Sequence, residues 1–196
     1  MRKLASTLLA CATLAGASAA YFVGPDLAVP EAHAGLAFAV SLKQLVKAAD
    51  LVVEGTTEES SSVWEEIPGV GRRIVTYTRI SVDDTAYGKS QKEVWVRTLG
   101  GIVDKIGQRV EGEAMLSSGA RALLFLKVRE DGTHAIVEMA QGHFIVSPDV
   151  SRKLTPSLAA VIRGKTPEKP ARELLAGKTV RAAFELIRAE KKAGDK

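Results

Sequence analysis

The stretch RRIVTYTRISVDD, residues 72–84, decides how this chain folds. Its even-numbered residues from Ile74 to Val82 are all β-branched, and a step of two places them on one face of a strand. The five residues before it, IPGVG (67–71), combine proline with glycine and are typical of a turn. Residues 51–64, which open with LVV, have the composition of another strand. The sequence therefore predicts a long β-hairpin.

Further strands follow this hairpin. Residues 93–97 alternate between valine and polar or large neighbours until the Gly100-Gly101 pair ends the strand. The segment ALLFLKV (122–128) is apolar at consecutive positions, which is typical of a central strand covered on both faces. Asp131-Gly132 predicts a hairpin turn, and the region 135–146 holds two more short strands.

Six or seven antiparallel strands in about 100 residues favour a small closed or nearly closed barrel. We therefore expect a mainly β fold with flanking helices (α+β), in which residues 41–147 form an antiparallel, OB-like barrel. Ser41 and Gln44 have the spacing of a capping box, so a short helix over residues 41–49 is expected to precede the barrel.

The chain changes character after Pro148. Thr155-Pro156 and Lys169-Pro170 place a proline where the first turn of a helix tolerates it, and Gly177 lies where a helix would end. We therefore expect residues 148–196 to form a helical C-terminal appendage to the barrel.

The N-terminus has the parts of a secretory signal peptide. Arg2 and Lys3 precede an uncharged run over residues 4–24, and Ala32-His33-Ala34 is an A-x-A cleavage site. We expect residues 1–34 to be removed and the protein to be exported, to the periplasm or the outside of the cell. The alternative is that the segment is retained as an anchor. We expect the protein to associate with a membrane only in that case.

The single cysteine, Cys11, lies within this predicted signal peptide. The mature chain would therefore have no disulfide and no cysteine metal ligand. The net charge of +4 comes from 27 basic and 23 acidic residues, and these are interspersed rather than arranged in one stripe. This charge distribution, together with export, argues against a nucleic-acid partner.

Part of the chain resembles known families. Residues 48–56 (AADLVVEGT), residues 76–82, Gly88 and Gly100-Gly101 resemble a pattern in exported bacterial proteins of unassigned function. The same region, 41–146, also looks like netrin-type modules, the OB-fold barrels that include tissue inhibitors of metalloproteinases. The resemblance implies a barrel. It does not imply their inhibitory mechanism, which uses an N-terminal cysteine that this chain lacks after cleavage.

No catalytic, metal or cofactor site is predicted. His134 and His143 are the only histidines after residue 34, whereas metal sites usually need three or four converging ligands. The paired acids Asp83-Asp84 and Glu65-Glu66 alternate along their strands, so the two members of each pair point to opposite faces. We therefore expect neither a metal nor a cofactor.

Five residues are candidates for ligand binding. Trp64 is either a packing residue opposite Ile74 or an exposed aromatic anchor. Gly100 and Gly101 either permit a positive backbone dihedral at a barrel corner or let a ligand approach the bare backbone. Gln141 and His143 flank a glycine, which allows close approach of a ligand or another backbone.

The leading functional hypothesis is an exported, non-catalytic binding module of the bacterial cell envelope, with an envelope or extracellular protein as its partner. One alternative is a secreted enzyme whose site surrounds His143, Gln141 and Glu138. Another is a netrin-type protease inhibitor that works without the cysteine.

Overall fold

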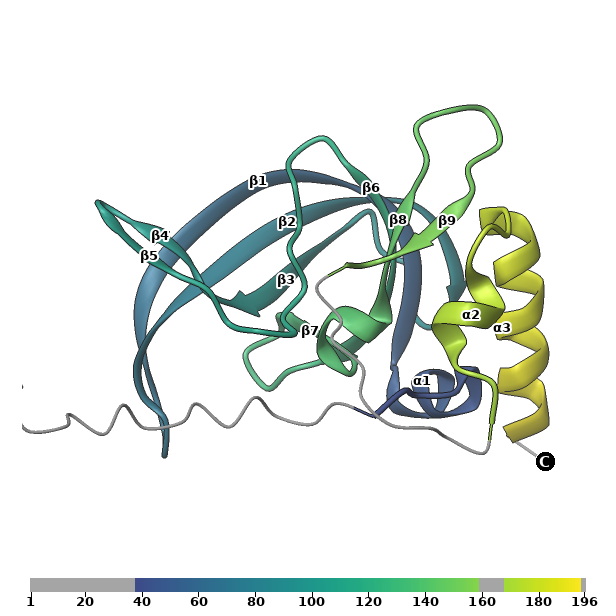
Figure 1. Ribbon diagram of the computed structural model, residues 1–196, viewed down its shortest axis with the longest axis horizontal. Helices are drawn as coiled ribbons and strands as arrows, with labels where there is room; N and C mark the ends of the chain where they lie inside the picture. The colour runs from purple at the N-terminus through teal and green to yellow at the C-terminus, as the bar shows by residue number, and fades with distance from the viewer. Residues whose placement is uncertain (1–37, 159–167, 195–196) are drawn as a thin grey trace, which may run out of the picture. The chain divides into compact units, whose positions relative to one another are not determined.

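One seven-stranded sheet organises the fold (Figure 1). The computed structural model describes residues 38–158 and 168–194, all within one unit that spans Ala34–Lys196. The predicted signal peptide with its cleavage site, Cys11 and the segment 159–167 lie outside the described residues. The strands of the main sheet are β1 (Leu51–Ile67), β2 (Gly71–Tyr87), β3 (Glu93–Leu99), β6 (Arg121–Val128), β7 (His134–Ile136), β8 (His143–Val146) and β9 (Leu154–Pro156). The fold is thus mainly β with helices, as predicted.

The long hairpin is confirmed. Strands β1 and β2 are antiparallel, with Trp64 opposite Ile74 and Ser62 opposite Thr76. Three register irregularities interrupt their pairing, and irregularities of this kind bend and twist a strand. Figure 1 shows the result, in which β1 and β2 arch together over the rest of the sheet.

Strand β6 is the central strand that its apolar sequence predicted. It pairs with β1, β7 and β8, and all of residues 122–126 are buried. The strand order is β1-β2-β3-β7-β6-β8-β9, and β1 also pairs with β6. The β3–β7 pairing is parallel and consists of Val96 opposite His134. Strand β1 therefore has neighbours on both of its edges.

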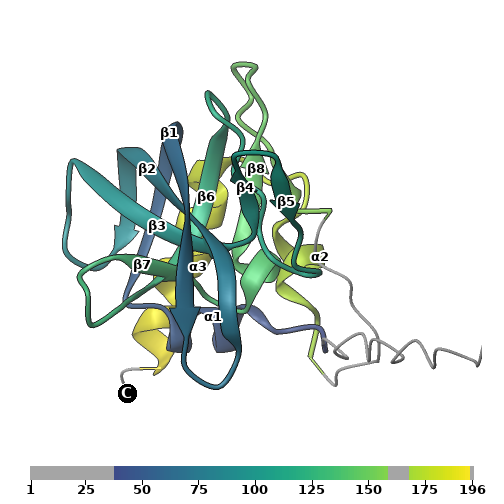
Figure 2. The ribbon, with the colours of Figure 1, turned by 90° about the vertical axis from the view of Figure 1, so that its left-hand side faces the viewer.

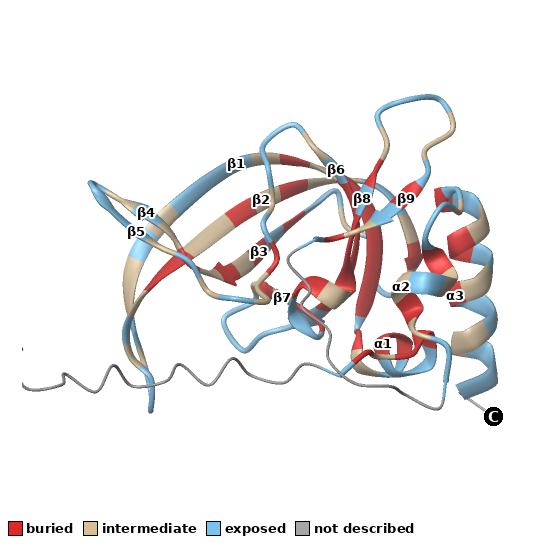
Figure 3. Cartoon of the chain, viewed as in Figure 1, coloured by how far each residue is buried: buried red, intermediate tan, exposed pale blue. Residues whose placement is uncertain are grey.

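The two faces of the sheet carry separate cores. Figure 3 colours the buried residues of the sheet and of the helices in red. On one face, Val52, Leu123 and Phe125 pack with the helices α1 (Leu42–Ala48), α2 (Ala171–Leu175) and α3 (Val180–Gly194). On the other, alternate residues of the same strands, among them Val53 and Leu124, form a second core with Ile80 and Val96. Figure 2 shows the sheet from the side away from the helices.

Specific hydrogen bonds hold the helices against the sheet. The predicted capping box at the start of α1 is confirmed, because Gln44 N donates to Ser41 Oγ (3.3 Å) and Ser41 N donates to Gln44 Oε1 (2.8 Å). The Tyr87 hydroxyl donates to the Val46 carbonyl at 2.7 Å, and Arg188 on α3 donates to the Ala86 carbonyl at 2.9 Å. Strand β2 is therefore bonded to both α1 and α3.

The C-terminal region differs from the prediction at its start. A helix beginning at Thr155-Pro156 is wrong, because residues 154–156 form strand β9 at the edge of the sheet. Proline is tolerated at such an edge because no neighbouring strand needs its missing N–H. The later helices occur as expected: α2 follows Pro170, and Gly177 follows α2 with a positive φ of 73°.

A small second sheet, which the sequence did not predict, lies beside the main one. Strands β4 (Gly101–Val103) and β5 (Ile106–Gln108) form a short hairpin directly after the Gly100-Gly101 break. The 3-10 helix η1 (Met139–Gly142) then separates β7 from β8. In Figure 1 the β4–β5 hairpin lies at the end of the sheet away from the three helices.

Candidate functional site

A pocket of about 580 Å³ opens on the face of the sheet that carries the second core. It lies where β1, β2 and β3 extend past the aliphatic core, and the β4–β5 hairpin and the loop 109–117 form its other walls. It is lined by Ser60, Ser62, Thr76, Thr78, Thr98, Leu99, Gly100, Gly101, Ile102, Gly107, Gln108, Arg109, Val110, Glu113, Ala114, Met115, Leu116 and Ser117. We call it the hydroxyl pocket.

Paired hydroxyl groups form the floor of this pocket. Ser60 and Ser62 on β1 lie opposite Thr78 and Thr76 on β2, and each pair is hydrogen-bonded across the strands, at 3.0 and 2.8 Å. Because side chains alternate along a strand, these residues continue the same row as the core residue Ile80. The row thus changes from aliphatic in the core to hydroxyl in the pocket.

One of these pairs has a fixed direction of hydrogen bonding. Thr76 Oγ1 donates its single hydrogen to the Gly100 carbonyl at 2.6 Å. The bond between Ser62 and Thr76 must therefore be donated by Ser62. Since the Ser62 hydrogen is then also used, Ser62 Oγ can only accept a hydrogen bond from a further group.

At Gly100 and Gly101 the backbone passes close to these hydroxyl groups. Their φ values are 93° and 134°, in the region that favours glycine. A Cβ atom at Gly101 would lie 2.3 Å from Thr76 Oγ1 and 2.5 Å from Ser62 Oγ. The need for a positive φ at the corner is confirmed, and the bare backbone of Gly101 also reaches the pocket.

Glu113 ties the loop 109–117 to the edge of β3. Its carboxylate accepts hydrogen bonds from Leu99 N at 3.3 Å and Ala114 N at 3.1 Å. Burial raises the pKa of Glu113, while these two backbone donors act in the opposite direction. Because each carboxylate oxygen binds a backbone amide, the residue mainly positions the loop.

The opposite face of the same strands carries a charged network. Arg97 Nη2 donates to Glu65 Oε2 at 2.7 Å, and the Tyr77 hydroxyl also donates to Glu65. Burial acts to raise the pKa of Glu65, but the hydrogen bonds from Tyr77 and Arg97 outweigh it, so this pKa is lowered. The charges of this network therefore lie on the face away from the hydroxyl floor.

The structure separates the five predicted residues. Gly100 and Gly101 line the hydroxyl pocket, whereas Trp64, Gln141 and His143 do not. Trp64 is half-buried opposite Ile74, as the packing interpretation predicted, and the Arg72 guanidinium lies 4.8 Å from the centre of its ring.

Gln141 makes hydrogen bonds within the protein, and His143 is buried. Gln141 Nε2 donates to the Phe38 carbonyl at 2.9 Å and Gln141 Oε1 accepts from Val40 N at 3.0 Å, so this side chain holds the segment before α1. His143 is buried on β8, and burial lowers its pKa to about 4. Glu138, the third residue of the enzyme alternative, is exposed at the start of η1.

The sequence did not predict a role for the hydroxyl residues or for Glu113. The pocket can be recognised only once the register of the hairpin places Ser60 and Ser62 opposite Thr78 and Thr76. A signal did exist in the sequence, because Thr76 and Thr78 interrupt an inward-facing row whose other members, Ile74, Ile80 and Val82, are aliphatic.

A second pocket, also of about 580 Å³, lies beside the start of α3. Charged residues of both signs line it, including Asp84, Arg152 and Arg188. Arg152 forms an ion pair with Glu54, whose side chain is fully buried. The second Glu54 oxygen has no hydrogen-bond partner among the described residues.

Comparison with models of protein families and with curated proteins finds no match to this chain. Within residues 38–158 and 168–194, no group of three or more histidine, cysteine or acidic side chains could hold a metal ion. None of the described helices has both the length and the apolar character needed to span a bilayer.

Proposed function

We propose that this protein is an exported, non-catalytic binding module of the bacterial cell envelope, and that the hydroxyl pocket is its binding site. The observation that carries the proposal is an open pocket of about 580 Å³ that four separate segments of chain form together. In this pocket the backbone of Gly101 lies close to the Ser62–Thr76 hydroxyl pair. Pockets of this size with a few placed polar groups are typical of ligand sites.

The strand pairings support an OB-like barrel as the scaffold. Strand β1 pairs with β2 on one side and with β6 on the other, and the parallel contact between β3 and β7 links the two remaining edges. We infer that these strands close into a small barrel. Nuclear Overhauser contacts between the backbones of Val96 and His134 in solution would test the linking contact.

Export and binding can be tested on the protein recovered from fractionated native cells. Intact mass spectrometry is expected to find a chain that begins at Gly35 in a soluble envelope fraction. Native mass spectrometry of the same material is expected to detect a bound species. A chain that retains residues 1–34 in the membrane would contradict cleavage.

The binding site is tested with a matched pair of variants. Ser60→Phe places a bulky side chain in the pocket, whereas Ser61→Phe places it on the opposite face of the same strand. The bound species is expected to disappear in the first variant and to remain in the second. Equal occupancy in both would contradict this choice of site.

A further inference from the structure

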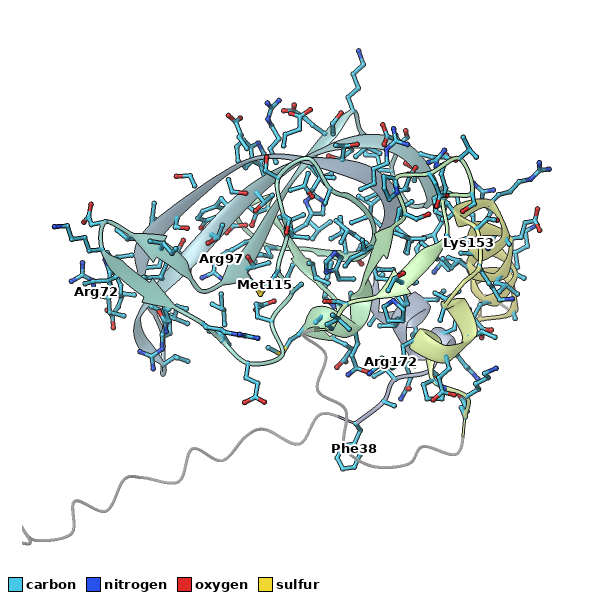
Figure 4. All side chains as sticks on the ribbon, turned by 45° about the horizontal axis from the view of Figure 1, so that its top comes forward. Phe38, Arg72, Arg97, Met115, Lys153 and Arg172 are labelled. Carbon is cyan, nitrogen blue, oxygen red and sulfur yellow. The ribbon has the colours of Figure 1, made fainter. Side chains whose placement is uncertain are left out.

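The walls of the hydroxyl pocket are mostly apolar. Leu99, Val110, Ala114 and Leu116 line it beside the hydroxyl floor. At its rim, Ile102 on the β4–β5 hairpin and Met115 on the loop 109–117 are 71% and 65% exposed. Figure 4 labels Met115, which projects from this loop. An occupant with an apolar part would cover these side chains and remove them from water.

The floor of the pocket offers both a donor and an acceptor. Ser62 Oγ can only accept, because its hydrogen is used on Thr76. The Ser60–Thr78 pair holds two hydroxyl hydrogens, and the bond between them uses one. When Thr78 donates to Ser60, the Ser60 hydrogen remains available to a ligand, because Ser60 is exposed. A ligand group that donates and accepts at once, such as a hydroxyl or an amide, matches this floor.

The hydroxyl floor of the pocket offers little to a charged ligand. Of the side chains that line it, only Arg109 and Glu113 are charged, and Glu113 already accepts two backbone hydrogen bonds. Neither charge lies in the hydroxyl rows of β1, β2 and β3. An ionic group placed on that floor would lose hydration without gaining an opposite charge, which is costly.

We propose that the hydroxyl pocket binds an uncharged amphipathic molecule, an alcohol or an amide with an apolar body. Its polar group lies on Ser62 and the Ser60–Thr78 pair, and its apolar body contacts Leu99, Val110 and Leu116. This inference rests on the proposed function, because it names the ligand class of the same site.

The test uses the purified chain and an uncharged fluorescent probe, N-phenyl-1-naphthylamine. The probe is expected to bind to the unmodified chain and to Ser61→Phe, and at least tenfold more weakly to Ser60→Phe. Probe binding that Ser60→Phe leaves unchanged, or an absence of probe binding, would overturn the inference.

Displacement of the probe then tests the ligand class. At pH 8, 1-decanol and decanamide are expected to displace it at concentrations at least tenfold lower than decanoate, which has the same chain length but carries a charge. In a Ser60→Ala/Thr78→Val variant, the probe should still bind while this preference is reduced. Ser61→Ala is the control and should keep the preference.

The two proposals fail in different ways. Displacement by decanoate as strong as that by decanol would overturn the ligand class, but the Ser60→Phe effect would still support the pocket as a binding site. A species bound in native material that Ser60→Phe does not remove would contradict the proposed site itself.

Discussion

Gly101 shows how one residue without a side chain shapes the candidate site. Its φ of 134° and its close approach to Ser62 and Thr76 both require glycine. The sequence alone pointed to Gly100 and Gly101 because paired glycines mark a backbone irregularity. It did not point to the hydroxyl groups beneath them, because serine and threonine serve equally well on a solvated strand and only the register brings them together.

Replacing Gly101 by alanine is expected to destabilise the fold by about 2–4 kcal/mol, since backbone strain and steric overlap add together. The matched control is Gly132→Ala. Gly132 also has a positive φ, 79°, but a Cβ atom there meets nothing within 4 Å, so only the strain of about 1 kcal/mol is expected. Urea denaturation measures both. Equal losses would show that the contact with Ser62 and Thr76 has no energetic weight.

His143 is expected to make stability depend on pH. Burial lowers its pKa in the folded state from 6.5 to about 4, so the unfolded chain binds the proton more readily. Its contribution is complete above pH 6.5 and is lost as the pH falls toward 4. Between pH 7.5 and pH 5 this loss amounts to about 2 kcal/mol.

A His143→Gln variant removes this titration. Denaturation at the two pH values should show a smaller loss for the variant than for the unmodified chain. Because burial also lowers the pKa of His134, part of the loss should remain in the variant. An unchanged pH dependence would mean that His143 titrates alike in the folded and unfolded states.

At the scale of elements, the long strands were predictable and the short ones were not. Strands β1, β2 and β6 carry enough residues for alternation or continuous apolar character to be recognised. Strands β4 and β9 have three residues each, which is too few for a periodic pattern. The hairpin that forms one wall of the hydroxyl pocket therefore could not be foreseen, although the glycine pair before it was.

The loop 109–117, another wall of the pocket, is expected to depend on Glu113. In Glu113→Gln, one of the two backbone amides faces an NH₂ group that cannot accept its hydrogen bond. Amide hydrogen exchange at Leu99 or Ala114 should then rise about tenfold, the equivalent of one such bond. The control is Glu111→Gln, an exposed residue on the same loop. Unchanged exchange at both amides would contradict this role.

At the scale of the whole unit, one ion pair connects the sheet to the loop beside α3. Glu54 on β1 is fully buried, and Arg152, its partner, lies in the loop between β8 and β9 and lines the pocket beside α3. Buried carboxylates are costly unless they are paired. The pair therefore favours the arrangement in which this loop lies against β1 of the long hairpin.

A double-mutant cycle tests this coupling. Arg152→Gln leaves the Glu54 carboxylate buried without its cation and is expected to destabilise the fold by about 3 kcal/mol. The double variant Glu54→Gln/Arg152→Gln removes the charge as well and should recover at least about 1 kcal/mol of that loss in urea denaturation. Arg181→Gln is the control, because Arg181 is 90% exposed and its ion pair with Glu185 lies on the surface of α3. Its free energy of unfolding is expected to change by less than about 0.5 kcal/mol. A double variant less stable than Arg152→Gln would contradict this coupling. It would mean that the Glu54 carboxylate is stable in the core without the arginine, and that backbone hydrogen bonds and apolar contacts hold the loop on the sheet.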